Sequence, residues 1–299
     1  MPTLQHPRGA TLRALAAVLL GAPSLAAAQD RVSSPAAANP AAAALRDASR
    51  LDTEGATSQA RVRFQQLIDS APDPAAKAAA QRAMAMSYAF DGDCVNTVRY
   101  EQMAIAYWAT REAADPQNAF YQEGELANEA ARVCIDAGNL DVAERWYRAG
   151  YALGLKEPAP KTHAKSLWDF RLAHALARLA ARRGQQAEAQ RQVAAARAIL
   201  AGDSAMAAQQ ARFFPSLVGY VALSTDSLQT AESELTRAIA MPGNARDPFL
   251  HCLLAMTEEK LGRAERAKAH YQQAYDLATA HNPPSAFARP YARRKLGLT

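Results

Sequence analysis

The chain has 299 residues and a formal net charge of +5, and 73 of its residues are alanine. Its 49% apolar content, with only 14 glycines and 16 prolines, excludes collagen-like, glycine-rich and charge-dominated disordered proteins. The low aromatic content of 7% argues against an all-β protein, because strands favour β-branched and aromatic residues, whereas alanine is the best helix former. The composition therefore favours helices.

The first 28 residues have the pattern of a secretory signal peptide. Arg8 and Arg13 precede a short apolar run, and an Ala-x-Ala end follows at Ala28, after which we expect cleavage. The apolar run is far shorter than the ~20 residues needed to cross a bilayer, and we expect no membrane span elsewhere. Residues 29–40 are predicted to form a flexible linker. The alanine- and arginine-rich usage favours a bacterial protein in the periplasm or the medium.

From residue 41 onward, apolar side chains recur at helical spacing in paired segments. The clearest unit begins at Asp247-Pro248, since proline is favoured at a first helical position, and Gly262 is expected to end its first helix in a left-handed conformation. Its second helix carries Ala267, Tyr271 and Ala274. Corresponding turn positions are predicted at Gly55, Gly92, Gly138, Gly184, Asp226 and Gly262.

The order of a small residue, a turn glycine, alanine, an aromatic residue and alanine resembles the tetratricopeptide repeat, a 34-residue helix–turn–helix unit. Residues 143–155 also resemble the related Sel1-like repeat. The resemblance implies an all-α fold, a right-handed α-solenoid of about six units over residues 41–299 with a polar capping helix at 285–298. The spacings of 36 to 46 residues between turns imply extended helices or longer connections. An ordinary alanine-rich helical bundle is the alternative.

The motifs of common enzymes are missing from the sequence. It has no phosphate-binding glycine-rich loop, no Gly-x-Ser-x-Gly elbow and no His-Glu-x-x-His pair. Its histidines are not spaced as zinc ligands, and Asp91-Gly92-Asp93 does not continue as a calcium loop, so we expect no cofactor and no metal. The mild, dispersed positive charge argues against nucleic-acid binding. We therefore expect no catalysis.

In tetratricopeptide proteins the first helix of each unit lines a concave surface, and the resemblance implies ligand-binding residues at the matching positions. These are Arg82, Asn128, Arg132, Arg171, His174, Arg178, Arg182, Tyr220 and Phe249. Four of them, from position 171 to 182, are spaced by three, four and four residues and form one helical stripe. A stripe of three arginines and a histidine repels itself unless it meets anions. Either a ligand supplies them, or Glu125 and Asp136 on the neighbouring helix do.

Two functions are compatible with these features. The first is an exported interaction module that binds a protein or peptide, with an acidic one suiting the basic stripe, in its concave groove. The alternative is a periplasmic small-solute-binding solenoid that serves a transporter or sensor. An open trough would favour the first function, and a deep closed cavity beside Arg171 would favour the second.

The three cysteines after residue 28 are Cys94, Cys134 and Cys252. Export to an oxidising compartment allows disulfides. In the repeat frame Cys94 and Cys134 lie at the same end of adjacent hairpins, whereas Cys252 lies several units away. We therefore expect a Cys94–Cys134 disulfide; the alternative is that all three are buried free thiols.

Overall fold

The computed structural model describes residues 40–298, and all regular secondary structure in that range is helical. The predicted signal peptide and all but the last residue of the predicted linker lie outside the described residues. The elements are α1 (Pro40–Glu54), α2 (Thr57–Asp69), α3 (Pro74–Phe90), α4 (Cys94–Ala109), α5 (Pro116–Asp136), α6 (Leu140–Leu155), α7 (Lys165–Arg182), α8 (Gln186–Gly202), α9 (Ser204–Gln210), the 3-10 helix η2 (Ala211–Phe213), α10 (Phe214–Ser224), α11 (Leu228–Ala240), α12 (Pro248–Lys260), α13 (Ala264–Leu277) and α14 (Pro283–Leu296). No helix of the described part is long and apolar enough to cross a membrane.

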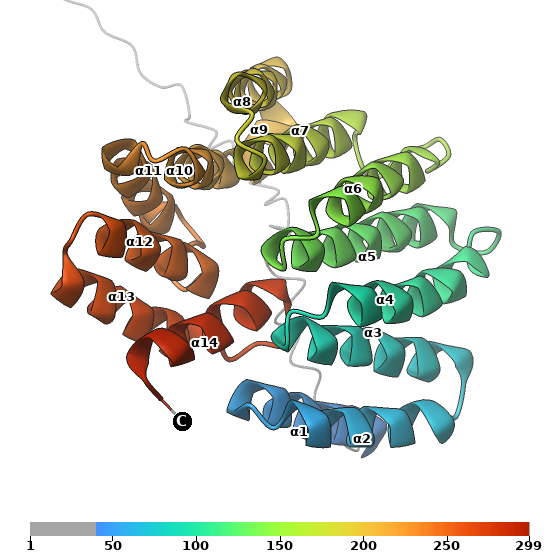
Figure 1. Cartoon of the computed structure of the whole chain (residues 1–299). Helices are drawn as coiled ribbons and strands as arrows, with labels where there is room; N and C mark the ends of the chain where they lie inside the picture. Colours follow the sequence, from blue (N-terminus) through green and yellow to red (C-terminus); the bar gives the residue numbers. More distant parts are fainter. Residues whose placement is uncertain (1–39, 299) are drawn as a thin grey trace, which may run out of the picture. The chain divides into compact units, whose positions relative to one another are not determined.

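Consecutive helices pack as hairpins, α1 with α2, α3 with α4, α5 with α6, α7 with α8, α10 with α11 and α12 with α13 (Figure 1). Every predicted turn position lies between the two helices of one hairpin and has a positive φ, for example 86° at Gly138 and 56° at Asp226. Glycine adopts this left-handed region without a steric penalty, and aspartate is one of the few other residues that tolerate it. The predictions of an all-α fold and of six pairs of helices are confirmed.

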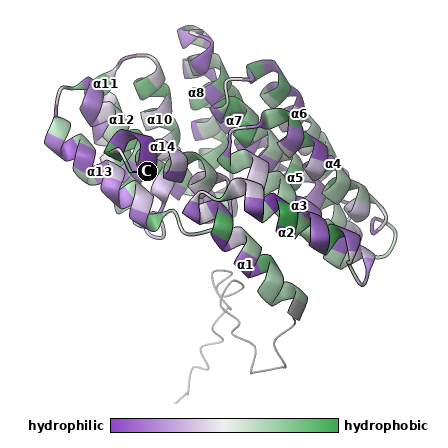
Figure 2. Ribbon diagram, turned by 60° about the horizontal axis from the view of Figure 1, so that its bottom comes forward, coloured by the Kyte–Doolittle hydropathy of each residue, from purple (hydrophilic) through white to green (hydrophobic). Residues whose placement is uncertain are grey.

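The small and large residues of the second helices explain the packing between hairpins. Ala60, Ala143, Ala189, Ala231 and Ala267 are buried where helices cross closely. Four residues further on, one turn away, the chain carries a large buried side chain, namely Phe64, Tyr147, Val193, Leu235 and Tyr271. The second hairpin differs, with Thr97 and Glu101 at these two positions. Figure 2 shows hydrophobic and hydrophilic residues mixed along most of the labelled helices, as expected of amphipathic helices.

The start of α12 follows the sequence prediction. Pro248 lies in its first turn, and the Asp247 side chain accepts the backbone N–H of Phe249 at 2.9 Å. The fifth unit is less regular than expected, because α9 and η2 precede α10, and α10 begins at Phe214 with Pro215 in its first turn. Pro215 therefore lies where proline is favoured, at the start of a helix, but the preceding short segment was not anticipated.

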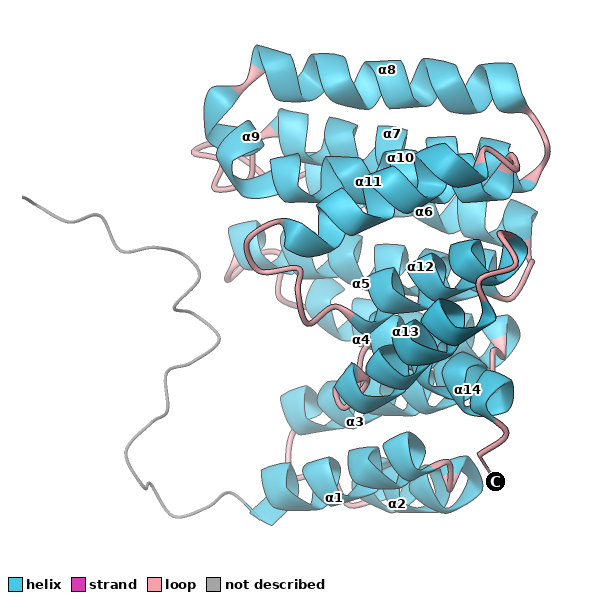
Figure 3. Ribbon diagram, turned by 90° about the vertical axis from the view of Figure 1, so that its left-hand side faces the viewer, coloured by secondary structure: helices cyan, strands magenta, loops and turns pink. Residues whose placement is uncertain are grey.

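The C-terminal helix α14 does more than cap the last hairpin. It packs on α12 and α13 and also on α3, α5 and α1, so the described helices form an array that closes on itself (Figures 1 and 3). His281 Nε2 lies 2.7 Å from Asp52 Oδ2, and Ser87 donates to the other oxygen of Asp52 at 2.8 Å. Ala286 and Ala292 of α14 are buried. The helix predicted as a polar cap therefore also has a buried face, and this face joins the two ends of the array.

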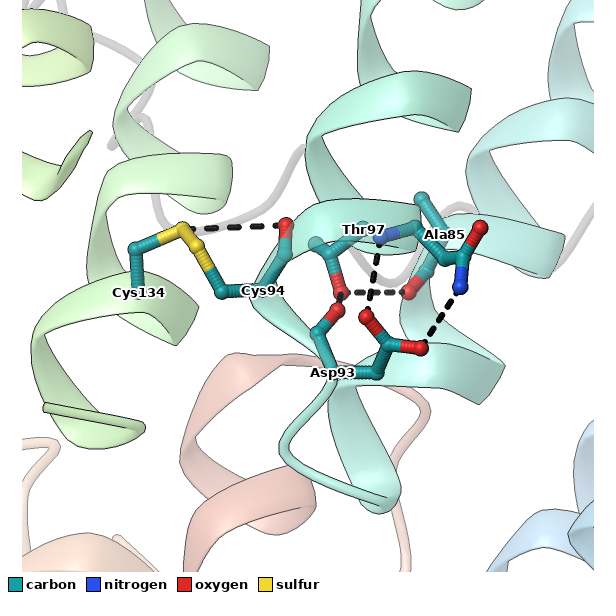
Figure 4. Close-up of a disulfide and its surroundings, with 6 residues drawn as sticks. Ala85, Asp93, Cys94, Thr97 and Cys134 are labelled. Atoms are coloured by element: carbon teal, nitrogen blue, oxygen red, sulfur yellow. Dashed lines mark hydrogen bonds between the residues drawn. A yellow bond between two sulfur atoms is a disulfide. The ribbon is translucent and has the colours of Figure 1, made fainter. Parts of the chain in front are cut away.

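Cys94 and Cys134 form a disulfide that joins the start of α4 to α5, with 4.7 Å between the Cα atoms (Figure 4). Beside it, the Thr97 hydroxyl donates to the backbone carbonyls of Asp93 at 2.8 Å and Ala85 at 3.3 Å. Cys252 is free and buried. The pairing expected from the sequence is the one that the structure has.

Candidate functional site

The first helices of successive hairpins enclose a pocket of about 270 Å³, which we call the arginine pocket. Its walls come from α5, α7, α12 and the segment from α9 to α10, with Tyr147 of α6 added to them. Seven of the residues predicted from the sequence line it, namely Asn128, Arg132, Arg171, His174, Arg178, Tyr220 and Phe249. The repeat positions therefore bring most of the predicted site together.

A second cavity, of about 390 Å³, adjoins the arginine pocket, and Tyr220 lines both. Its lining also includes Asp136, Arg182, Leu223, Leu253, Met256, Lys260, Phe287 and Tyr291. Arg182 lies here and not in the arginine pocket, one helical turn beyond Arg178 on α7. The predicted basic stripe on α7 thus serves two adjoining cavities.

Arginine–aromatic contacts give the arginine pocket its shape. The guanidinium carbon of Arg178 lies 4.4 Å from the centre of the Tyr220 ring and 5.6 Å from that of Phe249. The guanidinium of Arg132 lies 4.7 Å from the centre of the Phe249 ring. Such contacts orient a cation without neutralising it. Both guanidinium groups therefore keep their capacity to bind an anion.

Two arginines of the stripe already have acidic partners. Arg171 pairs with Glu125, and Arg178 Nη2 lies 3.4 Å from Asp136 Oδ1. The alternative considered for the stripe, pairing with α5, is therefore confirmed for these two residues. It does not hold for Arg182, whose hydrogen bond goes to the Tyr220 hydroxyl at 3.3 Å.

Arg132 forms no hydrogen bond or ion pair with any residue in the range 40–298, and its Nε is buried without a partner. The Nε of Arg178 is in the same situation. A buried donor that lacks an acceptor costs about 1–3 kcal/mol, and more when it is charged. The pocket therefore contains two N–H groups that an acceptor in the pocket would stabilise.

Asp136 is the carboxylate around which these cations gather. Burial raises its pKa, and Arg178, Arg132 and Arg182 oppose that shift electrostatically. Three guanidinium groups thus act electrostatically on one carboxylate, and that of Arg178 is paired with it. Asp136 itself lines the second cavity, and the acids that line the arginine pocket are Glu125, which pairs with Arg171, and Asp247, which caps α12. A helix N-terminus stabilises a negative charge, so the Asp247 carboxylate is already stabilised by its position at the start of α12.

His174 lies in the pocket as an uncharged group. Burial lowers its pKa to about 3, with Arg178 and Arg132 acting in the same direction. A neutral imidazole carries one donor and one acceptor nitrogen. His174 therefore adds hydrogen-bonding capacity to the pocket at neutral pH, but no positive charge.

Arg82 is the predicted site residue that the structure does not bring to either cavity. Its exposed side chain extends from α3 to Glu129 on α5, with Nη2 at 2.5 Å from Oε1. The sequence analysis missed Tyr147 and Phe170 in the arginine pocket, and Phe287 and Tyr291 in the second cavity. Tyr147 was recognisable only as a packing residue of its repeat, and the two residues of α14 reach the site through the closure of the array.

Comparisons with known proteins do not assign this chain to a family. No protein-family model matches it, and no curated protein matches its sequence. Within residues 40–298, no group of three or more histidine, cysteine, aspartate or glutamate side chains could hold a metal ion. The two cavities and their charges are therefore the features from which a function can be argued.

Proposed function

We propose that the protein is an exported binding module of the tetratricopeptide type, a right-handed α-solenoid without catalysis, and that it holds an anionic group in the arginine pocket. Six helical hairpins with left-handed turn residues, and an alanine followed four residues later by a large side chain in most second helices, support the family assignment. The predicted signal peptide supports export. The first candidate ligand is the acidic end of a protein or peptide.

The excess of guanidinium groups carries this proposal. Arg132, Arg178 and Arg182 all act electrostatically on Asp136, and two buried Nε–H groups, those of Arg132 and Arg178, lack an acceptor. A carboxylate is the acceptor that suits them, because arginine binds carboxylates through paired N–H groups. Phe170, Phe213 and Phe249 would contact the apolar part of the same ligand. An amphipathic anion therefore fits the pocket.

The size of the pocket distinguishes between ligands. A volume of about 270 Å³ suits the end of a chain or a small molecule, and not a long peptide. α14 also packs on α3 and α5, whose concave side a peptide lying along an open groove would use. A small anionic solute, delivered to a transporter or sensor, is therefore the second candidate. The observation that favours this second candidate is the limited volume of the arginine pocket.

Isothermal titration calorimetry on the purified exported protein tests the proposal. The probes are short peptides that end in glutamate, the same peptides with amidated carboxyl ends, and small aliphatic carboxylates. We expect saturable binding that weakens as salt rises and is lost in Arg132→Gln. Arg191→Gln, on the exposed side of α8, is the matched control. The absence of saturable binding by every probe at low salt would refute the proposal.

A further inference from the structure

The arginine pocket and the second cavity share one wall. Tyr220 lines both, its ring lies against Arg178, and its hydroxyl accepts a hydrogen bond from Arg182. The buried ion pair between Arg178 and Asp136 lies at the same boundary, since Arg178 lines the first cavity and Asp136 lines the second. A ligand that passes Tyr220 would therefore contact both cavities.

Each cavity presents one guanidinium group without an acidic partner. In the arginine pocket this group is Arg132, and in the second cavity it is Arg182, which donates only to Tyr220. Asp136 is the acid that lines the second cavity, and its carboxylate is already paired with Arg178. One carboxylate among three guanidinium groups leaves an excess of two positive charges, which one monoanion would not balance.

Lys260 adds a second cation to the lining of the second cavity. It pairs with Asp226 at 2.6 Å, but the two side chains are 50% and 78% exposed. Solvent-exposed pairs of this kind contribute at most about 1 kcal/mol, so Lys260 is readily available to a second anion. The remaining lining is mostly apolar, from Leu223, Leu253, Met256, Phe287 and Tyr291.

From this arrangement we infer that the ligand is a dicarboxylate with an apolar linker. One carboxylate binds Arg132 and Arg178 in the arginine pocket, the other binds Arg182 and Lys260 in the second cavity, and the linker passes Tyr220. This inference rests on the proposed function, because it takes the arginine pocket as an anion site. The same chemistry occurs in a free α,ω-dicarboxylic acid and in an acidic peptide end that carries a second carboxylate.

Calorimetry with linear α,ω-dicarboxylates, from glutarate to sebacate, and with monocarboxylates of the same lengths tests the inference. At one length we expect the native protein to bind the diacid at least about 10-fold more tightly than the monoacid, as expected for one charge-assisted hydrogen bond. Arg182→Gln should remove this preference, because it should weaken the diacid at least about 10-fold more than the monoacid. Arg132→Gln should weaken both acids, and Arg191→Gln neither. Arg182 is exposed, so we expect Arg182→Gln to fold normally, which its melting curve checks.

Peptides that end in glutamate, with and without a second acidic side chain upstream, form a parallel set of ligands. Tighter binding of the diacidic peptide than of any free diacid would identify a peptide as the source of the two carboxylates. Equal affinity for monoacids and diacids in both sets, with no effect of Arg182→Gln, would overturn the dicarboxylate inference and leave the proposed function standing. Failure of every acid to bind would overturn both.

Discussion

Arg178 and Asp136 form an ion pair across α7 and α5 in which the two side chains are only 6% and 11% exposed. The pair is buried at the boundary between two cavities, with Tyr220 and Phe249 against the guanidinium. Removing one partner of a buried pair leaves an uncompensated charge and costs about 3–5 kcal/mol. Arg132 and Arg182 also act on Asp136, so its carboxylate compensates more than one cation.

The first prediction concerns Asp136→Asn. This variant keeps the shape of the side chain but removes the one carboxylate among three guanidinium groups. We expect its free energy of unfolding, measured by urea denaturation at low salt, to fall by about 3 kcal/mol. Added sulfate should restore more stability to the variant than to the native protein, because sulfate would supply the missing negative charge. Equal effects of sulfate on both proteins would contradict the charge assignment.

The second prediction concerns Glu101, which occupies the position where other repeats have Phe64, Tyr147 or Leu235. Glu101 is buried, and neither of its carboxylate oxygens has a hydrogen-bond partner. Burial raises its pKa well above the usual range; the nearby Glu129 adds to this shift, and Arg82 opposes it. We expect Glu101→Leu to raise the free energy of unfolding at pH 8 by about 1–3 kcal/mol, as for the removal of an unsatisfied buried polar group.

The pH dependence of stability gives the same residue a second test. The pKa of Glu101 is higher in the folded protein than in the unfolded chain. Proton binding by Glu101 therefore contributes fully to stability below the pKa that Glu101 has in the unfolded chain, and this contribution is lost as pH rises toward the folded pKa. The gain from Glu101→Leu should therefore be smaller at pH 4 than at pH 8. Asp69→Leu, at the exposed end of α2, is a control for adding an apolar residue. A gain independent of pH would show that folding does not raise the pKa of Glu101.

The third prediction concerns the disulfide. Thiol titration of the unfolded, non-reduced protein should find one free thiol, that of Cys252, and three after reduction. The disulfide closes a loop with a sequence separation of 40, so replacing both Cys94 and Cys134 by serine should cost about 4 kcal/mol on the chain-entropy model. Three thiols before reduction would exclude the bond.

The fourth prediction concerns the closure of the array by α14. His281 bonds Asp52 and lies between the rings of Phe64 and Phe90, with ring-centre distances of 5.5 and 5.7 Å. We expect His281→Ala to cost about 2 kcal/mol and to speed hydrogen exchange in residues 283–296 more than in α6. Arg50→Gln, which removes an exposed pair within α1, should leave the exchange unchanged. Equally faster hydrogen exchange in all helices would contradict the prediction that His281 holds α14 in place independently of the other helices.

The local order of residues was enough to predict the paired helices, the six turn positions and the Cys94–Cys134 pair, although not α9 and η2. These features depend on contacts within a hairpin or between neighbours, where helical periodicity and left-handed turn residues act over a few positions. The first-helix positions also identified Arg132, His174 and Arg178 as residues that share a surface.

Only the tertiary structure decided where the array ends and what the arginines contact. Asp52 and His281 are 229 residues apart in the sequence and meet because the rotations between successive hairpins add up. The connections between hairpins vary in length, so no local sequence pattern determines the total rotation. The stripe on α7 did not reveal which of its arginines would pair with an acid. Arg178 reaches Asp136 while Arg182 reaches Tyr220, since partner choice depends on distances across helices that sequence spacing does not contain.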